Sequence, residues 1–141
     1  MTADAHFGGG EYVVATTVFV VSQDSSMRDS IAELIATAGL QAETFPSLEA
    51  WLAAVNRMRR GCLVLDASEQ DFAVAERLRT LAAVCARRPV VVLIDRGNVP
   101  IAVRVIKVGA ADVIEKPQRD EILLESIKRA AARNGAAHPH A

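Results

Sequence analysis

Residues 90–117 read VVVLIDRGNVPIAVRVIKVGAADVIEKP, and this stretch decides the fold. It opens with a continuous apolar run, 90–94, and a second short strand pattern occupies residues 111–115. Between them, residues 99–108 have the composition of an apolar helix that ends at Gly109. Continuously apolar strands are typical of a parallel sheet that helices cover on both faces. The stretch therefore predicts two parallel strands joined by a helical crossover.

The same alternation continues towards both ends of the chain. Further strands are predicted at residues 12–21, 40–45 and 62–66, each followed by a helical pattern, and residues 121–132 form the last helix. Five strands alternating with five helices predict a doubly wound α/β fold, with a five-stranded parallel sheet in the strand order 2-1-3-4-5. We expect one domain at 16–133, between a flexible N-terminal segment (1–15) and a flexible C-terminal tail (134–141).

Composition argues against several classes of protein. The formal net charge of −1 does not favour direct binding of nucleic acid, and the arginine clusters at 57–60 and 87–88 are interpreted as solvated faces. No stretch reaches the roughly 18 apolar residues of a membrane helix. Cys62 and Cys85 lack metal-site and CxxC spacing, which indicates reduced, buried thiols in a cytoplasmic protein. No nucleophile–base pair or ligand cluster is evident, so we expect no enzymatic activity.

Polar residues follow the predicted strands at the edge where a doubly wound sheet binds its ligands, beyond the carboxyl ends of the strands. In chain order they are Ser22, Gln23 and Asp24 after the first strand, Asp66 at the end of the third, Asp95 after Ile94 of the fourth, and Lys116 after the fifth. Asp24 is also placed to cap the first helix. The sequence therefore predicts a site at this edge.

Several short motifs occur with consistent spacing over roughly residues 17–130. They are Cys62-Leu63-Val64-Leu65-Asp66, Gly97-Asn98-Val99-Pro100, Lys107-Val108-Gly109-Ala110 and Asp112-Val113-Ile114-Glu115-Lys116-Pro117. Together they resemble the FixJ-type receiver domain of response regulators. The resemblance implies the flavodoxin-like (βα)5 fold and a role in two-component (phosphorelay) signal transduction.

The resemblance also implies roles for two charged residues. Asp66 stands at the phosphoacceptor position, and Lys116 stands where the family has a lysine that contacts the phosphoryl oxygens. The alternative interpretation is an inherited ion pair at the sheet edge, because opposite charges at this spacing stabilise each other without any phosphoryl chemistry.

Other positions depart from the family pattern. Ser22 and Gln23 replace the pair of acids that holds Mg²⁺, Ile94 replaces the switch hydroxyl, and Val113 replaces the aromatic residue that reports its movement. A hard divalent ion prefers several oxygen ligands and anionic charge. This joint replacement therefore favours a pseudo-receiver without a cofactor.

The helix predicted at 99–108 is unusually apolar, and only Arg104 and Lys107 interrupt it. Packing on a sheet hides one face of a helix, so some of these side chains must be exposed. The resemblance implies that this helix and the strand after it form the dimer and effector surface. We therefore predict an interaction surface for a homodimer or a protein partner, such as a histidine kinase or an output protein, at Ile101, Arg104, Val105 and Val108.

Alternative functions remain open at this stage. The leading hypothesis is an atypical receiver domain that acts as an interaction or dimerisation module independently of phosphorylation. The second is a working receiver, phosphorylated on Asp66 by a histidine kinase. The third is a flavin- or nucleotide-binding domain of the same fold, which residues 22–26 do not favour because they contain no glycine and include Asp24.

Overall fold

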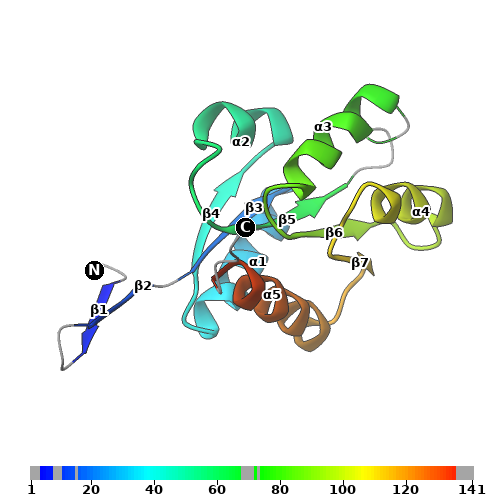
Figure 1. The fold of residues 1–141 in the computed structure, drawn as a ribbon. Helices are drawn as coiled ribbons and strands as arrows, with labels where there is room; N and C mark the ends of the chain where they lie inside the picture. Colours follow the sequence, from blue (N-terminus) through cyan, green and yellow to red (C-terminus); the bar gives the residue numbers. More distant parts are fainter. Residues whose placement is uncertain (1–3, 8–10, 15, 68–71, 73, 136–141) are drawn as a thin grey trace.

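The computed structural model describes residues 4–7, 11–14, 16–67, 72 and 74–135. Five parallel strands form one sheet in the order β4-β3-β5-β6-β7 (Figure 1). The strands are β3 (Thr17–Val21), β4 (Gln41–Phe45), β5 (Cys62–Asp66), β6 (Val90–Ile94) and β7 (Asp112–Glu115); the helices are α1 (Ser25–Thr37), α2 (Leu48–Ala54), α3 (Ala75–Cys85), α4 (Val99–Lys107) and α5 (Asp120–Gly135). Counted along the chain, these strands lie in the predicted order 2-1-3-4-5.

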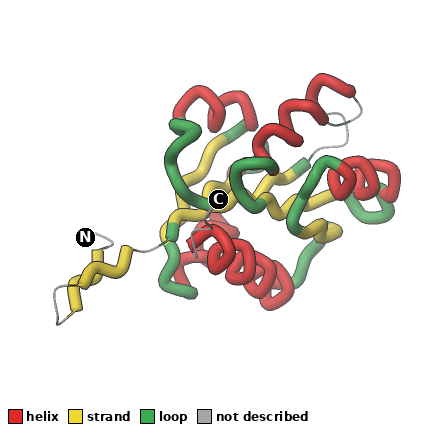
Figure 2. Tube along the Cα trace, viewed as in Figure 1, coloured by secondary structure: helices red, strands yellow, loops and turns green. Residues whose placement is uncertain are grey.

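Helices cover both faces of the sheet (Figure 2), which produces two hydrophobic cores. Alternate residues of β3 face opposite sides, so Phe19 packs with the helices α2, α3 and α4, whereas Val18 packs with α1 and α5. Burying a valine or leucine side chain completely contributes about 1.5–3 kcal/mol. This two-sided burial explains why the strands are continuously apolar in sequence.

Polar caps fix where three of the helices begin. The side chain of Asp24 accepts a hydrogen bond from the Met27 amide at the start of α1. Ser47 caps α2 and Asn98 caps α4 in the same manner. Each such cap contributes about 1 kcal/mol. The predicted capping role of Asp24 is confirmed, and its carboxylate is therefore directed into the helix end.

The prediction of one continuous strand over residues 12–21 is wrong. Strand β2 (Glu11–Val14) ends before β3 and pairs antiparallel with β1 (Asp4–Phe7) in a separate two-stranded sheet. In the main sheet, β3 pairs with β4 over residues 17–21. The N-terminal segment thus contains regular structure, and its expected flexibility stays a prediction. In the C-terminal tail, α5 continues to Gly135, and residues 136–141 lie outside the described part.

Candidate functional site

The carboxyl ends of β3, β5, β6 and β7 bring the predicted polar residues together at one edge of the sheet. Asp66 ends β5, and Lys116 directly follows β7. The ammonium Nζ of Lys116 lies 2.7 Å from Oδ1 of Asp66. The predicted proximity of these two residues is therefore confirmed.

The second oxygen of Asp66 is occupied by a hydroxyl. Ser22, directly after β3, donates a hydrogen bond of 2.7 Å from Oγ to Oδ2 of Asp66. Ser22 is only 1% exposed, and its Oγ also accepts a hydrogen bond from the Asp24 amide. Arg28 holds the same residue from α1, because its guanidinium donates to the Ser22 carbonyl oxygen at 2.6 Å. Ser22 is thus a fixed, neutral donor to Asp66.

Lys116 has a second carboxylate partner that sequence reasoning did not assign to it. Asp95 Oδ1 lies 3.2 Å from the Lys116 ammonium. Partial burial works to lower the pKa of Lys116, but the hydrogen bonds and charges of Asp66 and Asp95 outweigh it and raise that pKa above its usual value. The ammonium is therefore held protonated between two acids.

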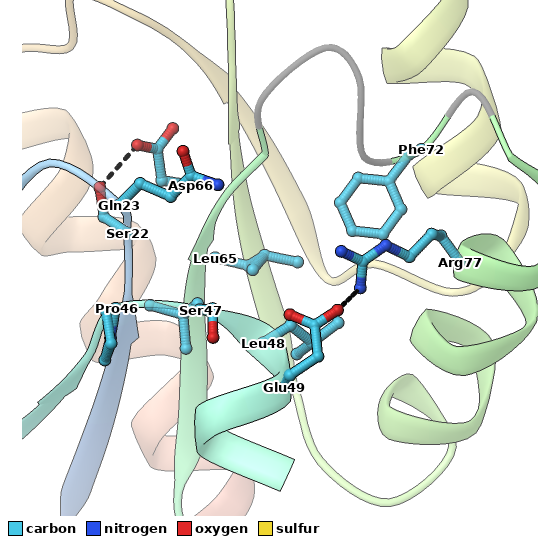
Figure 3. A pocket seen from close by; sticks show the side chains of 11 residues that line it. Ser22, Gln23, Pro46, Ser47, Leu48, Glu49, Leu65, Asp66, Phe72 and Arg77 are labelled. Atoms are coloured by element: carbon cyan, nitrogen blue, oxygen red, sulfur yellow. Dashed lines mark hydrogen bonds and ion pairs between the residues drawn. The ribbon is translucent and has the colours of Figure 1, made fainter.

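Beside Asp66 lies a shallow hollow between β3, β5, α2 and α3. Its lining consists of Val21, Ser22, Gln23, Pro46, Ser47, Leu48, Glu49, Leu65, Asp66, Phe72 and Arg77. Figure 3 shows Ser22 turned towards Asp66 on one side, and an ion pair between Glu49 of α2 and Arg77 of α3 on the other. Gln23 is exposed at the rim. The lining of the hollow is therefore polar at Ser22 and Asp66 and apolar at Leu65.

The two predicted switch positions, Ile94 and Val113, hold apolar side chains that pack in or against the hydrophobic core. Ile94 is 2% exposed and belongs to the core cluster that contains Ile101 and Val105 of α4. Val113, from β7, packs against the same cluster. Neither side chain carries a hydrogen-bonding group, so this part of the site has no side chain that could bind a phosphoryl oxygen.

Residues 18–128 match the family model of the response regulator receiver domain. The chain belongs to this family. It is 36% identical over 115 residues to the transcriptional regulatory protein FixJ of Rhizobium meliloti (strain 1021), covering 82% of this chain and 56% of that protein. It is 32% identical over 116 residues to the response regulator protein TodT of Pseudomonas putida, covering 82% and 51%. The chain therefore spans about half the length of the curated relatives it matches.

Solved structures agree with this assignment. The crystal structure of FixJ-N matches with a TM-score of 0.73 and 35% identity, over 85% of this chain and 96% of that chain. The response regulator StyR matches with a TM-score of 0.74 and 32% identity, over 87% and 62%. The predicted fold and family are thus confirmed, and the protein is a receiver domain of two-component signal transduction.

The side chains of this receiver domain do not fit the Mg²⁺ ion that the family implies. Asp24 is engaged as a helix cap, and Ser22 uses its hydroxyl to bond Asp66. Among the described residues, no group of three or more histidine, cysteine, aspartate or glutamate side chains is arranged to hold a metal ion. A divalent cation prefers several anionic oxygens, and Ser22 and Gln23, at the positions of the family's acid pair, carry no charge.

The exposed surface of α4 differs from the predicted one. Ile101 and Val105 are buried at 4% and 0% exposure, so their assignment to the interaction surface is wrong. They face the sheet, and the helical repeat turns Val99, Val103 and Ile106 outwards at 62%, 44% and 57% exposure. The other two predicted residues differ, since Arg104 is exposed and Val108 is half-buried. The receiver domain therefore has an exposed apolar strip on α4.

Two other expectations were tested by burial. Both cysteines are free; Cys62 is buried as predicted, whereas Cys85 is half-buried, and burial raises the pKa of each thiol to about 11. Arg88, expected on a solvated face, is instead 6% exposed and donates to the carbonyl oxygen of Gly61 at 3.0 Å. No helix in the described part of the chain is long and apolar enough to cross a membrane.

Proposed function

We propose that this receiver domain is a pseudo-receiver: an interaction module that signals through protein contacts, independently of phosphorylation of Asp66. The observation that carries this proposal is that a neutral hydroxyl, from Ser22, contacts the Asp66 oxygen that Lys116 does not contact. Lys116 and Ser22 each contact one oxygen at 2.7 Å. Phosphoryl transfer depends mainly on positioning and charge stabilisation, and the neutral Ser22 hydroxyl supplies no charge where the family pattern has an acid that would hold a divalent cation.

The loop before α4 supports the same proposal. A receiver that switches needs a group that moves towards a phosphoryl oxygen, and Ile94 is an apolar core residue at that position. The Gly97 amide donates to the Glu115 carboxylate at 3.0 Å, and the Lys116 amide donates to the Ile94 carbonyl at 2.8 Å. These contacts hold the loop against β7 without any added group.

The exposed strip on α4 is the surface we propose for protein contacts. It consists of Val99, Val103 and Ile106, with Arg104 and Lys107 exposed beside it. Exposed apolar side chains that recur on one helix face are typical of a protein interface. A second copy of the domain is the proposed occupant, through α4 and β7. The remaining proposed partners are an output protein and a histidine kinase.

The alternative is a working receiver that a histidine kinase phosphorylates on Asp66. One observation favours it, which is the 2.7 Å contact between Asp66 and Lys116. That lysine is the group that would bind a phosphoryl oxygen. Under this alternative, Ser22 releases Asp66 when a phosphodonor enters.

Amide NMR spectra test the proposal. Mg²⁺ is added to the protein first, and beryllium fluoride second, as a mimic of a phosphorylated aspartate. The proposal predicts no saturable shift at Asp66, Lys116 or α4 at millimolar Mg²⁺. Saturable shifts that are absent in Asp66→Asn would establish the working receiver instead. Labelling of Asp66 by a small phosphodonor provides the independent check, with Asp66→Asn as the matched control.

A further inference from the structure

A single ammonium group joins the ends of three neighbouring strands. Lys116 follows β7, and its Nζ contacts Asp66 at the end of β5 and Asp95 just after β6. Since β6 lies between β5 and β7, the ammonium bridges the carboxyl ends of three of the five strands of the sheet. The Lys116 side chain is 23% exposed, against 12% for Asp66 and 44% for Asp95. The contact with Asp95 is therefore the more solvated of the two.

Asp95 is also the first residue of the loop that leads into α4. Its carbonyl oxygen accepts a hydrogen bond from the Asn98 amide at 3.1 Å. Asn98 then caps α4 by accepting from the Ile101 amide at 3.3 Å. The carboxylate of Asp95 and the cap of α4 are thus connected through one short turn.

We propose that Asp95 is a positioning residue, whose carboxylate ties the start of α4 to the Lys116–Asp66 pair. This contact, the tether, fixes the position of the start of α4, and with it the positions of the exposed side chains Val99 and Val103. This inference rests on the proposed function, because a permanent carboxylate on Lys116 positions α4 without a phosphoryl group. In this protein the second anion beside Lys116 is the Asp95 carboxylate of the chain itself, and not a phosphoryl group.

Charge and exposure set the expected size of the effect. An ion pair that is partly exposed contributes modestly, because solvent screens it. Loss of the Asp95 carboxylate is therefore expected to raise the equilibrium constant for local opening of the loop before α4 by about two- to fivefold. The hydrogen bond from the Gly97 amide to Glu115 is a further attachment of this loop to β7, so local opening of the loop, and not its unfolding, is expected.

Hydrogen exchange measured by NMR tests the tether at the amides of Gly97, Asn98 and Ile101. Asp95→Asn is expected to accelerate their exchange by about two- to fivefold. The effect should vanish in a Lys116→Met background, since a double-mutant cycle isolates the contact between the two side chains. Glu33→Gln, which removes an exposed acid from α1, is the matched control and should leave these amides unchanged.

A second readout separates the tether from a purely structural role of Asp95. The Asp95→Asn substitution is expected to lower the pKa of Lys116, followed by the NMR shift of its terminal methylene. Unchanged exchange in Asp95→Asn, or equal acceleration in the two backgrounds, overturns the tether. A saturable response of the wild-type protein to beryllium fluoride overturns the proposed function instead, so the two failures are distinguishable.

Discussion

The hydroxyl of Ser22 donates a 2.7 Å hydrogen bond to Oδ2 of Asp66, from the strand next to it in the sheet. A hydroxyl and a carboxylate at this position have opposite consequences. The hydroxyl stabilises the Asp66 carboxylate as a neutral donor, and it adds no negative charge that a cation besides Lys116 would have to balance. A second carboxylate there would repel Asp66 and require a further cation. We therefore propose that the internal hydrogen bond from Ser22 takes the place of the metal site that the family implies.

Acidic side chains at positions 22 and 23 should give the domain a binding site for Mg²⁺. The triple variant Ser22→Asp, Gln23→Asp, Ile94→Thr is expected to bind Mg²⁺ at least about tenfold more tightly than the wild type, because it adds two anionic oxygen ligands beside Asp66. Isothermal titration calorimetry measures the affinity. The same variant with Asp66→Asn is the control and should lose the gain. No gain in the triple variant would mean that the shape of the hollow, rather than its charge, excludes the ion.

The contacts of Lys116 with Asp66 and Asp95 predict a definite dependence of stability on pH. The pKa of Lys116 is raised in the folded protein above its usual value of 10.5, so the folded state binds the lysine proton more tightly than the unfolded state does. The resulting stabilisation is fully present below pH 10.5 and is lost as the pH rises through the folded pKa. The free energy of unfolding of the wild type should therefore exceed that of Lys116→Met by a constant amount from pH 7 to about 10, and the difference should shrink above that.

Urea unfolding at a series of pH values measures this difference. Groups other than Lys116 titrate in both proteins and cancel in the comparison. A difference that grows between pH 10 and 11.5 would contradict the assignment, because it would mean that the unfolded state holds the lysine proton more tightly.

Much of the fold was predictable because it depends on local pattern. Buried parallel strands are continuously apolar, so the runs at 62–66 and 90–94 located β5 and β6 within a residue. The proximity of Asp66 and Lys116 followed from the rule that strand ends share an edge. The hydrogen bond from Ser22 to Asp66 did not follow, since it depends on the rotamers of residues 44 positions apart.

Two errors of prediction have physical causes. The apolar residues of α4 cover both the face on the sheet and an exposed strip, so its sequence did not reveal which of them meet the sheet, and Ile101 and Val105 were mistaken for surface residues. Arg88 was taken for a solvated residue because arginine is rarely buried. Its burial depends on the carbonyl oxygens of Gly61 and Arg57, which lie 27 and 31 positions away along the chain.

The strip on α4 predicts an effect of charge on self-association. Val103→Glu is expected to abolish the proposed dimer, because it places a carboxylate in the centre of the apolar strip. Sedimentation equilibrium over a range of protein concentrations measures the effect. The stability of the monomer should change by no more than about 0.5 kcal/mol, since Val103 is 44% exposed.

Met58→Glu is the matched control for this variant. Met58 is also an exposed apolar residue, at 79%, but it lies in the loop before β5. The Met58→Glu substitution should leave self-association of the domain unchanged. Equal loss of association in both variants would point to a general effect of charge, and a wild-type protein that is monomeric at all concentrations would exclude the dimer.

Arg88 predicts a loss of stability far from the site. Its guanidinium lies 5.1 Å from the Trp51 ring centroid and 5.5 Å from that of Phe19, and it donates to the Gly61 carbonyl oxygen. Burial lowers the pKa of Arg88. Arg88→Met should cost about 2–3 kcal/mol, because it leaves a buried carbonyl oxygen without a donor and removes the contacts with the rings. Trp51, the one tryptophan of the chain, reports unfolding by fluorescence.

The neighbouring Arg87 provides the control for this measurement. Arg87 is exposed, so Arg87→Met removes the same charge and should change stability by no more than about 0.5 kcal/mol. Similar losses in the two variants would mean that charge, and not the buried contacts of Arg88, causes the effect.

Alanine substitutions at two glycines, Gly39 and Gly61, distinguish the cost of backbone strain from the cost of steric overlap. Gly61 has a φ of +147°, and a Cβ atom there would lie 2.6 Å from Phe19 Cε2 and 2.9 Å from the Thr17 carbonyl oxygen. Gly39 has a φ of +77°, and a Cβ atom there would meet nothing within 4 Å. Gly39→Ala is therefore expected to cost about 1 kcal/mol from strain alone. Gly61→Ala should cost about 3–5 kcal/mol, because the overlap displaces Phe19 from its core as well.

Denaturant unfolding followed by Trp51 fluorescence compares the two glycine variants. Trp51 packs edge-on against Phe19, with ring centroids 5.7 Å apart, so displacement of Phe19 should also shift the emission of the folded Gly61→Ala protein. Gly39→Ala should keep the wild-type emission, because its backbone lies at the end of α1, away from this core cluster. Equal losses of stability in the two variants, with unchanged emission, would show that β3 and the loop before β5 shift to accommodate a methyl group.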